Sequence, residues 1–388
     1  MADLDTKFRR LDRVRGPNLW PDIETREPRP MPDGGAGHRV AAAAVALALA
    51  AGGAVLVTRA FFPGDRPVER RVRPAESPPA PVDPVVDVTL PIKWPSSIVY
   101  GEGSIWVAAS ANDGTGAGTV YRIDPDTAEI LAEIQVPSVP GWESGGGGME
   151  VADGSLWIAG YLDEGDQGAL LRIDAATNAL EDVVPLGGRF AGDVGVDAEA
   201  IWVTVFADPS VQLVRLDRGT LTVDFRSSLE VDWAREILTV DGHVWVRTTQ
   251  GALSKIDPRT GGVVQRVDVP GGLTSLTTFQ GAIWGATWKA SQGNLLARID
   301  PATGEFVLLP AETLGFLVES GPSGLWGRWD PGVQGMLGVA QFDPVTGRVN
   351  ASVALEGGNQ PVAMAVASSS VWVTGYKEGV TRVELRPA

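Results

Sequence analysis

The sequence contains no cysteine and only two histidines, His38 and His243, among its 388 residues. Without cysteine the chain has no disulfide, no thiolate zinc site and no cysteine nucleophile. The sequence shows no recognisable Ser-His-Asp set, no metal-binding histidine cluster and no nucleotide-binding fingerprint. These absences disfavour catalysis, although they do not exclude every kind of enzyme.

Basic residues are also scarce, because 32 Lys and Arg stand against 48 Asp and Glu, for a net charge of −16. Residues 1–84 hold 13 Lys and Arg against 11 Asp and Glu, a net +2, so residues 85–388 hold 19 against 37, a net −18. An acidic body repels the phosphate backbone, so nucleic acid is not an expected partner. Forty-eight Gly and 28 Pro favour short strands and tight turns over surface helices.

The longest apolar stretch lies near the N-terminus, where Val40 to Val57 form an unbroken run of apolar or small residues between Arg39 and Arg59. It predicts one transmembrane helix, residues 39–60, that anchors the chain in the membrane. A cleaved signal peptide is the alternative, but the region before the run is too long for an ordinary one. Eight Lys and Arg before the run and five after it favour a cytoplasmic N-terminus and an extracytoplasmic C-terminal domain.

Short segments flank this anchor on both sides. Residues 1–38 are predicted to be a cytoplasmic tail with a short amphipathic helix, because Leu4, Phe8 and Leu11 follow helical spacing among basic residues. That helix either lies on anionic lipid or docks on a cytoplasmic regulator through residues 4–26. Residues 61–84 hold seven Pro from position 63 onward and predict an extended linker.

The remainder of the chain repeats one phrase seven times. A strand Trp recurs every 39 to 51 residues, an apolar residue stands eight positions before it, and an Asp after it opens a turn such as DPRTG; the series is Trp106, Trp157, Trp202, Trp245, Trp284, Trp326 and Trp372. This period is typical of four-stranded blades. It predicts an all-β fold, a seven-bladed β-propeller of antiparallel blades over residues 85–388. The last copy stops after three strands, so the orphan strand at 85–92 is expected to complete it and close the ring.

Two parts of the chain resemble known bacterial groups. The Trp-Val-Thr and Arg-Ile-Asp-Pro-x-Thr-Gly phrases resemble YVTN-type and streptogramin-lyase-like propellers, which include ligand binders, scaffolds, lyases and cofactor-dependent dehydrogenases. The lyases use a histidine base on the loop face, and no residue here matches it. Residues 18–26, NLWPDIETR, resemble the tails of membrane-anchored regulators encoded beside sigma factors. The resemblances imply a single-pass protein of the bacterial cell membrane.

Candidate binding residues are those that break the repeat. In a propeller, the loops that lead into each blade and the loops after each second strand gather on one face around the axis. On that face the sequence places Trp94, Trp142, Tyr161, Arg189, Phe190, Phe206, Trp233, Arg235, Trp288, Phe316, Trp329 and Tyr376. Aromatic platforms with a few Arg are typical of surfaces that bind sugar rings, peptides or flat ligands. The alternative is that several of them cap their own loops.

Four carboxylates are predicted to lie near the axis: Asp193 and Glu236, nine residues before their Trp, and Glu150 and Glu319, seven before theirs. They are weak candidates for a Ca²⁺ site or for an acid and base, and hydrogen bonding to strand ends is the simpler alternative. No other cofactor is expected. The sequence therefore predicts a membrane-anchored propeller that binds a ligand, glycan or protein through aromatic loops, with a propeller enzyme as the alternative.

Overall fold

The computed structural model describes residues 80–112, 117–140, 148–162, 167–208, 210–229, 234–248, 251–289, 293–333, 336–355, 361–375 and 378–388, without the side chains of Arg235, Lys289 and Glu378. The predicted tail, the membrane anchor and linker residues 61–79 lie outside this set. Within it the chain forms strands and turns, and it has no helix long and apolar enough to cross a membrane.

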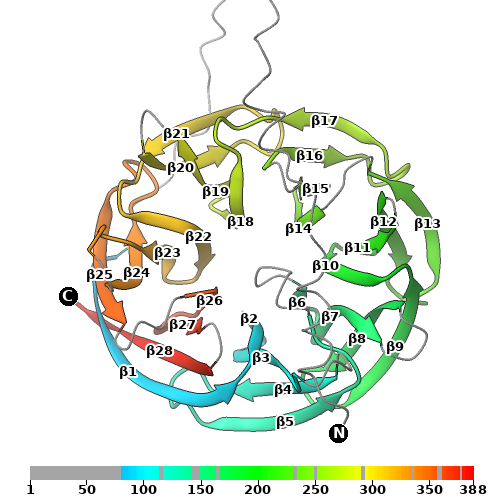
Figure 1. Ribbon diagram of the computed structural model, residues 1–388, viewed down its shortest axis with the longest axis horizontal. Coiled ribbons are helices and arrows are strands. Elements are labelled where there is room, and N and C mark those ends of the chain that lie inside the picture. Colours follow the sequence, from blue (N-terminus) through cyan, green and yellow to red (C-terminus); the bar gives the residue numbers. More distant parts are fainter. Residues whose placement is uncertain are drawn as a thin grey trace, which may run out of the picture. The chain divides into compact units, whose positions relative to one another are not determined.

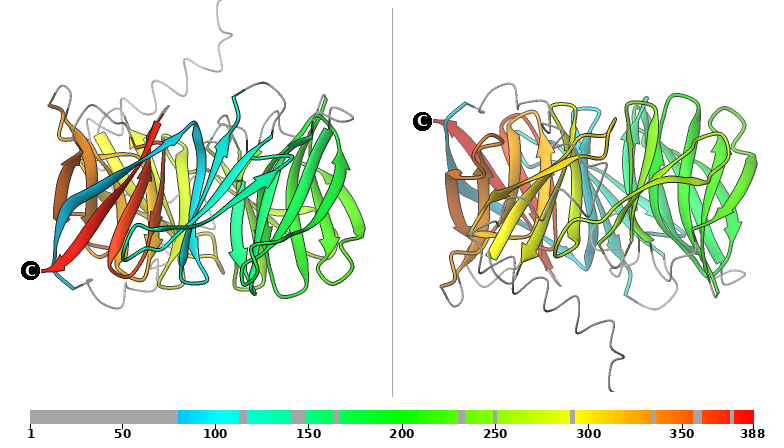
Figure 2. Two further views of the ribbon diagram at one scale, coloured as in Figure 1. Left: turned by 90° about the horizontal axis from the view of Figure 1, so that it is seen from below. Right: turned by 90° about the horizontal axis from the view of Figure 1, so that it is seen from above.

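Seven antiparallel sheets of four strands stand around a central axis as the blades of a propeller (Figure 1). Within each blade the first strand lies nearest the axis and the last on the outer wall (Figure 1). Seen from the side, the strands run between two faces of the ring, and loops project from both (Figure 2). The predicted all-β, seven-bladed fold is confirmed.

Blades 1 to 3 take four consecutive strands each. Blade 1 consists of β2 (Pro95–Gly101), β3 (Ser104–Ser110), β4 (Gly118–Ile123) and β5 (Ile130–Val136). Blade 2 consists of β6 (Met149–Ala152), β7 (Ser155–Leu162), β8 (Gln167–Asp174) and β9 (Leu180–Gly187). Blade 3 consists of β10 (Phe190–Val196), β11 (Ala200–Ala207), β12 (Ser210–Asp217) and β13 (Val223–Ser228).

Blades 4 to 6 repeat this order. Blade 4 consists of β14 (Ala234–Val240), β15 (His243–Thr248), β16 (Leu253–Ile256) and β17 (Val263–Val267). Blade 5 consists of β18 (Leu273–Phe279), β19 (Ala282–Lys289), β20 (Gly293–Ile299) and β21 (Phe306–Pro310). Blade 6 consists of β22 (Leu314–Gly321), β23 (Gly324–Trp329), β24 (Leu337–Phe342) and β25 (Val349–Leu355).

Blade 7 joins the two ends of the described chain. It contains β26 (Ala363–Val366), β27 (Ser370–Thr374) and β28 (Glu378–Pro387), with β1 (Val82–Lys93) paired to β28 on the outside. This is the closure that the orphan strand predicts. The strand begins at Val82 and not at Val85, and its Pro84 is tolerated because β1 has a neighbour on one side only.

The seven strand tryptophans fill the gaps between neighbouring blades. Each is at most 2% exposed, and each shares a hydrophobic cluster with residues of the following blade. Trp106 of blade 1, for example, packs among Met149, Leu156 and Ile158 of blade 2. A large ring at a fixed register therefore supplies the apolar wedge between twisted sheets, as the spacing predicts.

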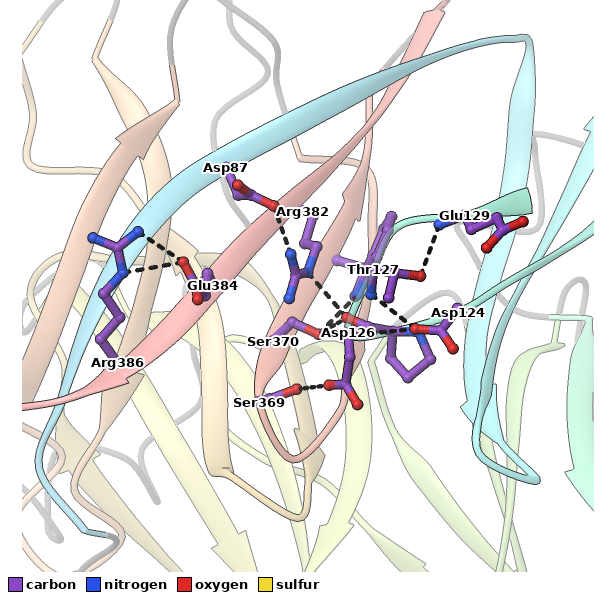
Figure 3. A network of polar contacts seen from close by, with 12 residues as sticks. Asp87, Asp124, Asp126, Thr127, Glu129, Ser369, Ser370, Arg382, Glu384 and Arg386 are labelled. Carbon is purple, nitrogen blue, oxygen red and sulfur yellow. Dashed lines mark hydrogen bonds and ion pairs between the residues drawn. The ribbon is translucent and has the colours of Figure 1, made fainter. Parts of the chain in front are cut away.

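Basic residues on the third strands of six blades add a polar connection between blades; blade 6 has Gln341 at this position. The charged groups of Arg122, Arg172, Arg215, Lys255 and Arg298 lie 5.1 to 5.7 Å from the ring centroid of the cross-strand Trp. Several also reach the Asp-Pro turn of the next blade: Lys255 donates to the main-chain oxygen of Pro301 at 3.0 Å. At the ring closure, Arg382 donates to Pro125 of blade 1 at 3.0 Å (Figure 3). The turns themselves are capped by Asp, as in Asp124, whose Oδ1 accepts from the N–H groups of Asp126 and Thr127.

Candidate functional site

The loop face is the face of the ring where the first strand of each blade begins and the second strand ends. Strand register brings the two predicted sets of loop residues to this one end of a blade. In blade 3, Phe190 at the start of β10 pairs with Phe206 near the end of β11. In blade 6, Leu314 at the start of β22 pairs with Trp329 at the end of β23.

Three of the predicted aromatics lie open to solvent. Trp288, in β19, is 56% exposed, and Trp94, just before β2, is 37% exposed. Phe316, in an irregular stretch of β22, is also 56% exposed. These side chains are available for contact with another molecule, because nothing among the described residues covers them.

Other predicted aromatics are partly or wholly packed. Phe206 is buried and stacks on Phe190, with ring centroids 4.2 Å apart and planes 18° from parallel. Trp329 is half-buried against the core of blades 5 and 6, and Tyr161 is half-buried at the end of β7. Capping of loops, the alternative for these residues, therefore describes Phe206 best.

The remaining predicted loop residues are an exposed Arg, an Arg whose side chain is not described, and three aromatics outside the described residues. Arg189 is exposed and lies 3.4 Å from Asp208 across its own loop, measured from Nη1 to Oδ2. Arg235 belongs to β14, and its side chain is not among those described. Trp142, Trp233 and Tyr376 lie outside the described residues. Their part in a site stays a prediction.

Two further apolar side chains of this face are exposed, although they are not among the predicted binding residues. Val333 and Met336, in the loop between β23 and β24, are 54% and 39% exposed. Trp288, Phe316, Val333 and Met336 all lie toward the loop face of the neighbouring blades 5 and 6, and we call this set of exposed side chains the blade 5–6 patch. Their position after a second strand predicts that they lie on the loop face, but being aliphatic they do not belong to the aromatic set.

The channel along the axis encloses about 320 Å³ and is lined by the first strands of the blades. All four predicted carboxylates line it: Glu150, Asp193, Glu236 and Glu319. Their two registers in the sequence, nine and seven residues before the strand Trp, lead to the same cavity. All four side chains therefore lie at the axis of the ring, where the repeat places them.

Three of the carboxylates connect neighbouring first strands. Asp193 of blade 3 accepts hydrogen bonds from the N–H groups of Gly148 in blade 2 and Ile237 in blade 4. Glu150 accepts from the N–H of Val196 at 2.8 Å, which joins blades 2 and 3. Such bonds satisfy main-chain donors that the sheets leave free at their inner edges.

The other two carboxylates, Glu319 and Glu236, lie further round the ring. Glu319 of blade 6 accepts from the Thr277 hydroxyl of blade 5 at 2.7 Å and from the N–H of Ser320 at 2.9 Å. Glu236 instead forms an ion pair with Arg247 of its own blade, 2.7 Å from Oε2 to Nε. Arg247 donates in addition to the main-chain oxygen of Leu273 in blade 5, at 3.1 Å. We call these four carboxylates and Arg247 the axial belt.

Burial raises the pKa of three carboxylates of the axial belt. Loss of hydration raises the pKa of Glu150 to about 8, and the charges of Asp193 and Asp197 add to the effect. Burial likewise raises the pKa of Asp193 to about 7 and that of Glu319 to about 7, with the nearby Glu236 charge contributing to both. Hydrogen bonds from N–H groups act in the opposite direction but do not offset burial.

The geometry of the belt fits a structural function better than a metal site. Oxygens that a cation would need are already bonded to N–H, hydroxyl and guanidinium groups. Across the described part of the chain, no three His, Asp or Glu side chains are placed to hold a metal ion. A Ca²⁺ site on Asp193, Glu236, Glu150 and Glu319 remains a prediction with no cluster to support it.

The fold defines the class of protein, a seven-bladed β-propeller, and structural comparison agrees. The WD40 domain of Pan2 from Neurospora crassa matches with a TM-score of 0.56 and 11% identity, over 75% of this chain and 89% of that one. BamB from Moraxella catarrhalis matches with a TM-score of 0.50 and 13% identity, over 78% of this chain and 99% of that one. No family model and no curated protein matches the chain. At these identities the likeness concerns the fold alone.

Proposed function

We propose that this chain is a membrane-anchored binding protein whose propeller, outside the cytoplasm, holds a ligand, glycan or protein on its loop face. The observation that carries the proposal is the blade 5–6 patch, formed by Trp288, Phe316, Val333 and Met336. Exposed apolar groups that gather on one face are typical of interaction sites. Propellers commonly serve as binding scaffolds, which is consistent with this use.

The contrast between two sets of tryptophans supports a surface role for the patch. The seven strand tryptophans are buried because they fill the ring, whereas Trp288 is 56% exposed and lies four residues after Trp284 in the same strand. Packing therefore accounts for the first set and not for Trp288. Aromatic side chains are favoured at binding surfaces because they bury large areas with few rotatable bonds.

The predicted anchor at residues 39–60 would place the propeller at the membrane, and residues 4–26 would offer a contact for a cytoplasmic regulator. A sensor that binds outside and signals inside is the arrangement we infer from these two segments. It rests on the sequence patterns alone.

A propeller enzyme with an axial acid and base is the second candidate. One observation favours it, because Asp193 and Glu319 have pKa values raised to about 7, the range that suits proton transfer. Their inter-blade hydrogen bonds favour a structural function instead. Metal analysis and a pH profile of any activity found would separate the two functions.

Site-specific photo-cross-linking in cells tests the binding proposal without a known ligand. A benzophenone amino acid is introduced into the full-length chain at Trp288, or at Val264 as a matched control. Val264 is 61% exposed but lies on the outer strand β17, away from the loop face. We expect discrete cross-linked products from position 288, none from 264, and loss of the products when Phe316→Ala is added. Equal products from both positions would contradict a binding loop face.

A further inference from the structure

The residue two positions after each strand tryptophan differs sharply between blades. It is small in five blades and Arg in two; the series is Ala108, Ala159, Thr204, Arg247, Ala286, Arg328 and Thr374. All seven positions lie in second strands near the loop face. Blades 4 and 6 therefore place a long cation where the others have room only for a small side chain.

In blade 4 the cation is neutralised. Arg247 is 6% exposed and forms the 2.7 Å ion pair with Glu236 described above. It also donates to the main-chain oxygen of Leu273. A buried charge with a carboxylate and a carbonyl around it is a satisfied structural group.

In blade 6 the same position has no such partner. Arg328 is 7% exposed, and Leu317 stands where blade 4 has Glu236. Among the described residues Arg328 forms no hydrogen bond or ion pair; its Nε is buried without an acceptor, whereas its two terminal nitrogens are not fully buried. The electrostatic attraction of Asp330 favours its charge, while loss of hydration lowers the pKa of Arg328.

Arg328 packs against two residues near the start of β22, Gly315 and Phe316. Its side-chain stem lies over Gly315, where a Cβ would come within 3.0 Å of the Arg328 Cγ and Cδ atoms. Its guanidinium carbon lies 4.2 Å from the centre of the Phe316 ring. Phe316 in turn is more than half exposed on the loop face. The cation is thus held beneath an aromatic ring that itself faces solvent.

A buried and unpaired charge is costly, and proteins rarely retain one without a counterion. Arg298 shares these features, because it is also 7% exposed and its Nε is buried without an acceptor, but its neighbouring ring, Trp284, is buried between blades, whereas Phe316 is 56% exposed on the loop face. Arg328 has no counterpart in the repeat except Arg247, which carries its own carboxylate. The missing anion at Arg328 therefore points to a molecule from outside the chain.

We propose that Arg328 and Phe316 form an anion site on the loop face, which binds a carboxylate or phosphate joined to a flat or apolar group. The guanidinium supplies a planar set of donors for two oxygens of the anion, and Phe316 covers the adjoining apolar part. The site deepens the binding function proposed above, on which it rests, by defining the chemistry of the ligand.

Small probes test this site in the full-length, detergent-solubilised protein. Benzoate and phenyl phosphate carry the anion on a flat ring, and benzamide has nearly the shape of benzoate without its charge. We expect saturation-transfer NMR to show benzoate or phenyl phosphate binding at least 10-fold more tightly than benzamide. Which anion binds better distinguishes a carboxylate ligand from a phosphate ligand. Equal binding of all three probes would overturn the proposal.

Two variants locate the binding. Arg328→Met removes the charge but keeps much of the volume, and it should weaken the better anion at least 10-fold. Arg226→Met is the matched control, because Arg226 is an exposed Arg of the outer strand β13 and lies outside the proposed site, and it should leave the affinity unchanged. Equal affinity of wild type and the Arg328→Met variant would rule out the site, as would an equal loss in both variants.

Thermal unfolding gives a readout that a purely structural role would reverse. Removing an unpaired buried charge should raise the Tm of the Arg328→Met variant above that of the wild type, and saturating anion should raise the Tm of the wild type only. A lower Tm for the variant would show that Arg328 supports the fold and would overturn the proposal. If instead cross-links at position 288 persist in the Arg328→Met variant while anion binding is absent from both proteins, the binding function stands without the anion site.

Discussion

Arg382, near the end of the described chain, donates from Nη1 to Oδ2 of Asp87, 295 residues earlier, at a distance of 2.5 Å. The same guanidinium donates from Nε to the main-chain oxygen of Pro125, which belongs to blade 1 (Figure 3). One side chain of β28 therefore contacts both the strand that completes blade 7 and the blade next to it. These contacts add to the pairing of β1 with β28 that closes the ring.

Loss of the closing strand should abolish the fold as a whole. Deletion of residues 85–92 removes most of β1 and leaves β28 with a free edge, so we expect no cooperative thermal transition. Deletion of residues 66–73 removes the same length from the predicted linker and should leave Tm unchanged. Circular dichroism during heating measures both. An unchanged Tm after the first deletion would contradict closure by β1.

The hydrogen bonds of Arg382 should contribute more to the free energy of unfolding than the ion pair of Arg386 with Glu384 on the same strand. Arg382→Met removes hydrogen bonds from a side chain that is 7% exposed, and we expect the free energy of unfolding to fall by about 2 kcal/mol. Arg386→Met removes an ion pair with Glu384 from a side chain that is 56% exposed, so this variant should unfold at nearly the same urea concentration as the wild type. Urea unfolding followed by fluorescence compares the two. Similar losses would mean that the hydrogen bonds of Arg382 add nothing special.

The two kinds of tryptophan should differ in stability. Trp245→Ala leaves a large cavity between blades 4 and 5 and should lower the free energy of unfolding by about 3 to 5 kcal/mol. Trp288→Ala removes an exposed ring and should change it by less than about 0.5 kcal/mol. Urea unfolding of both variants measures this. A loss of several kcal/mol at Trp288 would assign it to packing and weaken the proposed binding face.

Stability should fall as pH rises through the range set by Glu150. The folded state holds this proton up to about pH 8, whereas the unfolded chain releases it near 4.5. Between these values the folded state binds more protons, so the free energy of unfolding decreases with increasing pH. Glu150→Gln cannot ionise, yet its amide oxygen can still accept from Val196. We expect this variant to exceed the wild type by more than about 1 kcal/mol at pH 8.5, with the advantage lost at pH 5.

A surface carboxylate provides the control for that measurement. Glu133 is exposed on the outer strand β5, and Glu133→Gln should follow the wild type at both pH values. Urea unfolding at pH 5 and pH 8.5 gives the four differences needed. If Glu150→Gln shows the same pH dependence as the wild type, burial of Glu150 does not raise its pKa as described.

Spacing in the sequence was enough to predict the ring, because three independent columns repeat in one register. The Trp column predicts the packing between blades, the apolar column eight residues earlier predicts the first strands, and the Asp column predicts the turns. The unpaired strand at 85–92 predicts the closure. Placement of the four carboxylates on the axis follows from the same register, since any residue of a first strand lies near the channel. Repetition therefore fixes position along and around the ring.

Spacing could not predict what each side chain contacts. Phe206 and Trp288 occupy equivalent positions, four residues after their Trp, yet the first is buried beneath a loop and the second is exposed. The difference arises because Phe206 has Phe190 to stack on across the strand pair, whereas Trp288 pairs with Asn294. Arg328 was not predicted because the sequence position alone does not distinguish it from Arg247. The two differ in the first-strand residue nine positions before the Trp, which is Glu236 in blade 4 and Leu317 in blade 6.

Closure by the first strand also has a consequence for biosynthesis. Thr89 of β1 bonds to Thr381 of β28, a separation of 292 residues. At about 5 to 20 residues per second, β1 waits roughly 15 to 60 seconds for its partner to be made. During that interval six blades can form while the seventh stays open, with the strand edges of β1 exposed to other chains. A propeller built in this way therefore has one pairing step, between β1 and β28, that no local contact can accelerate.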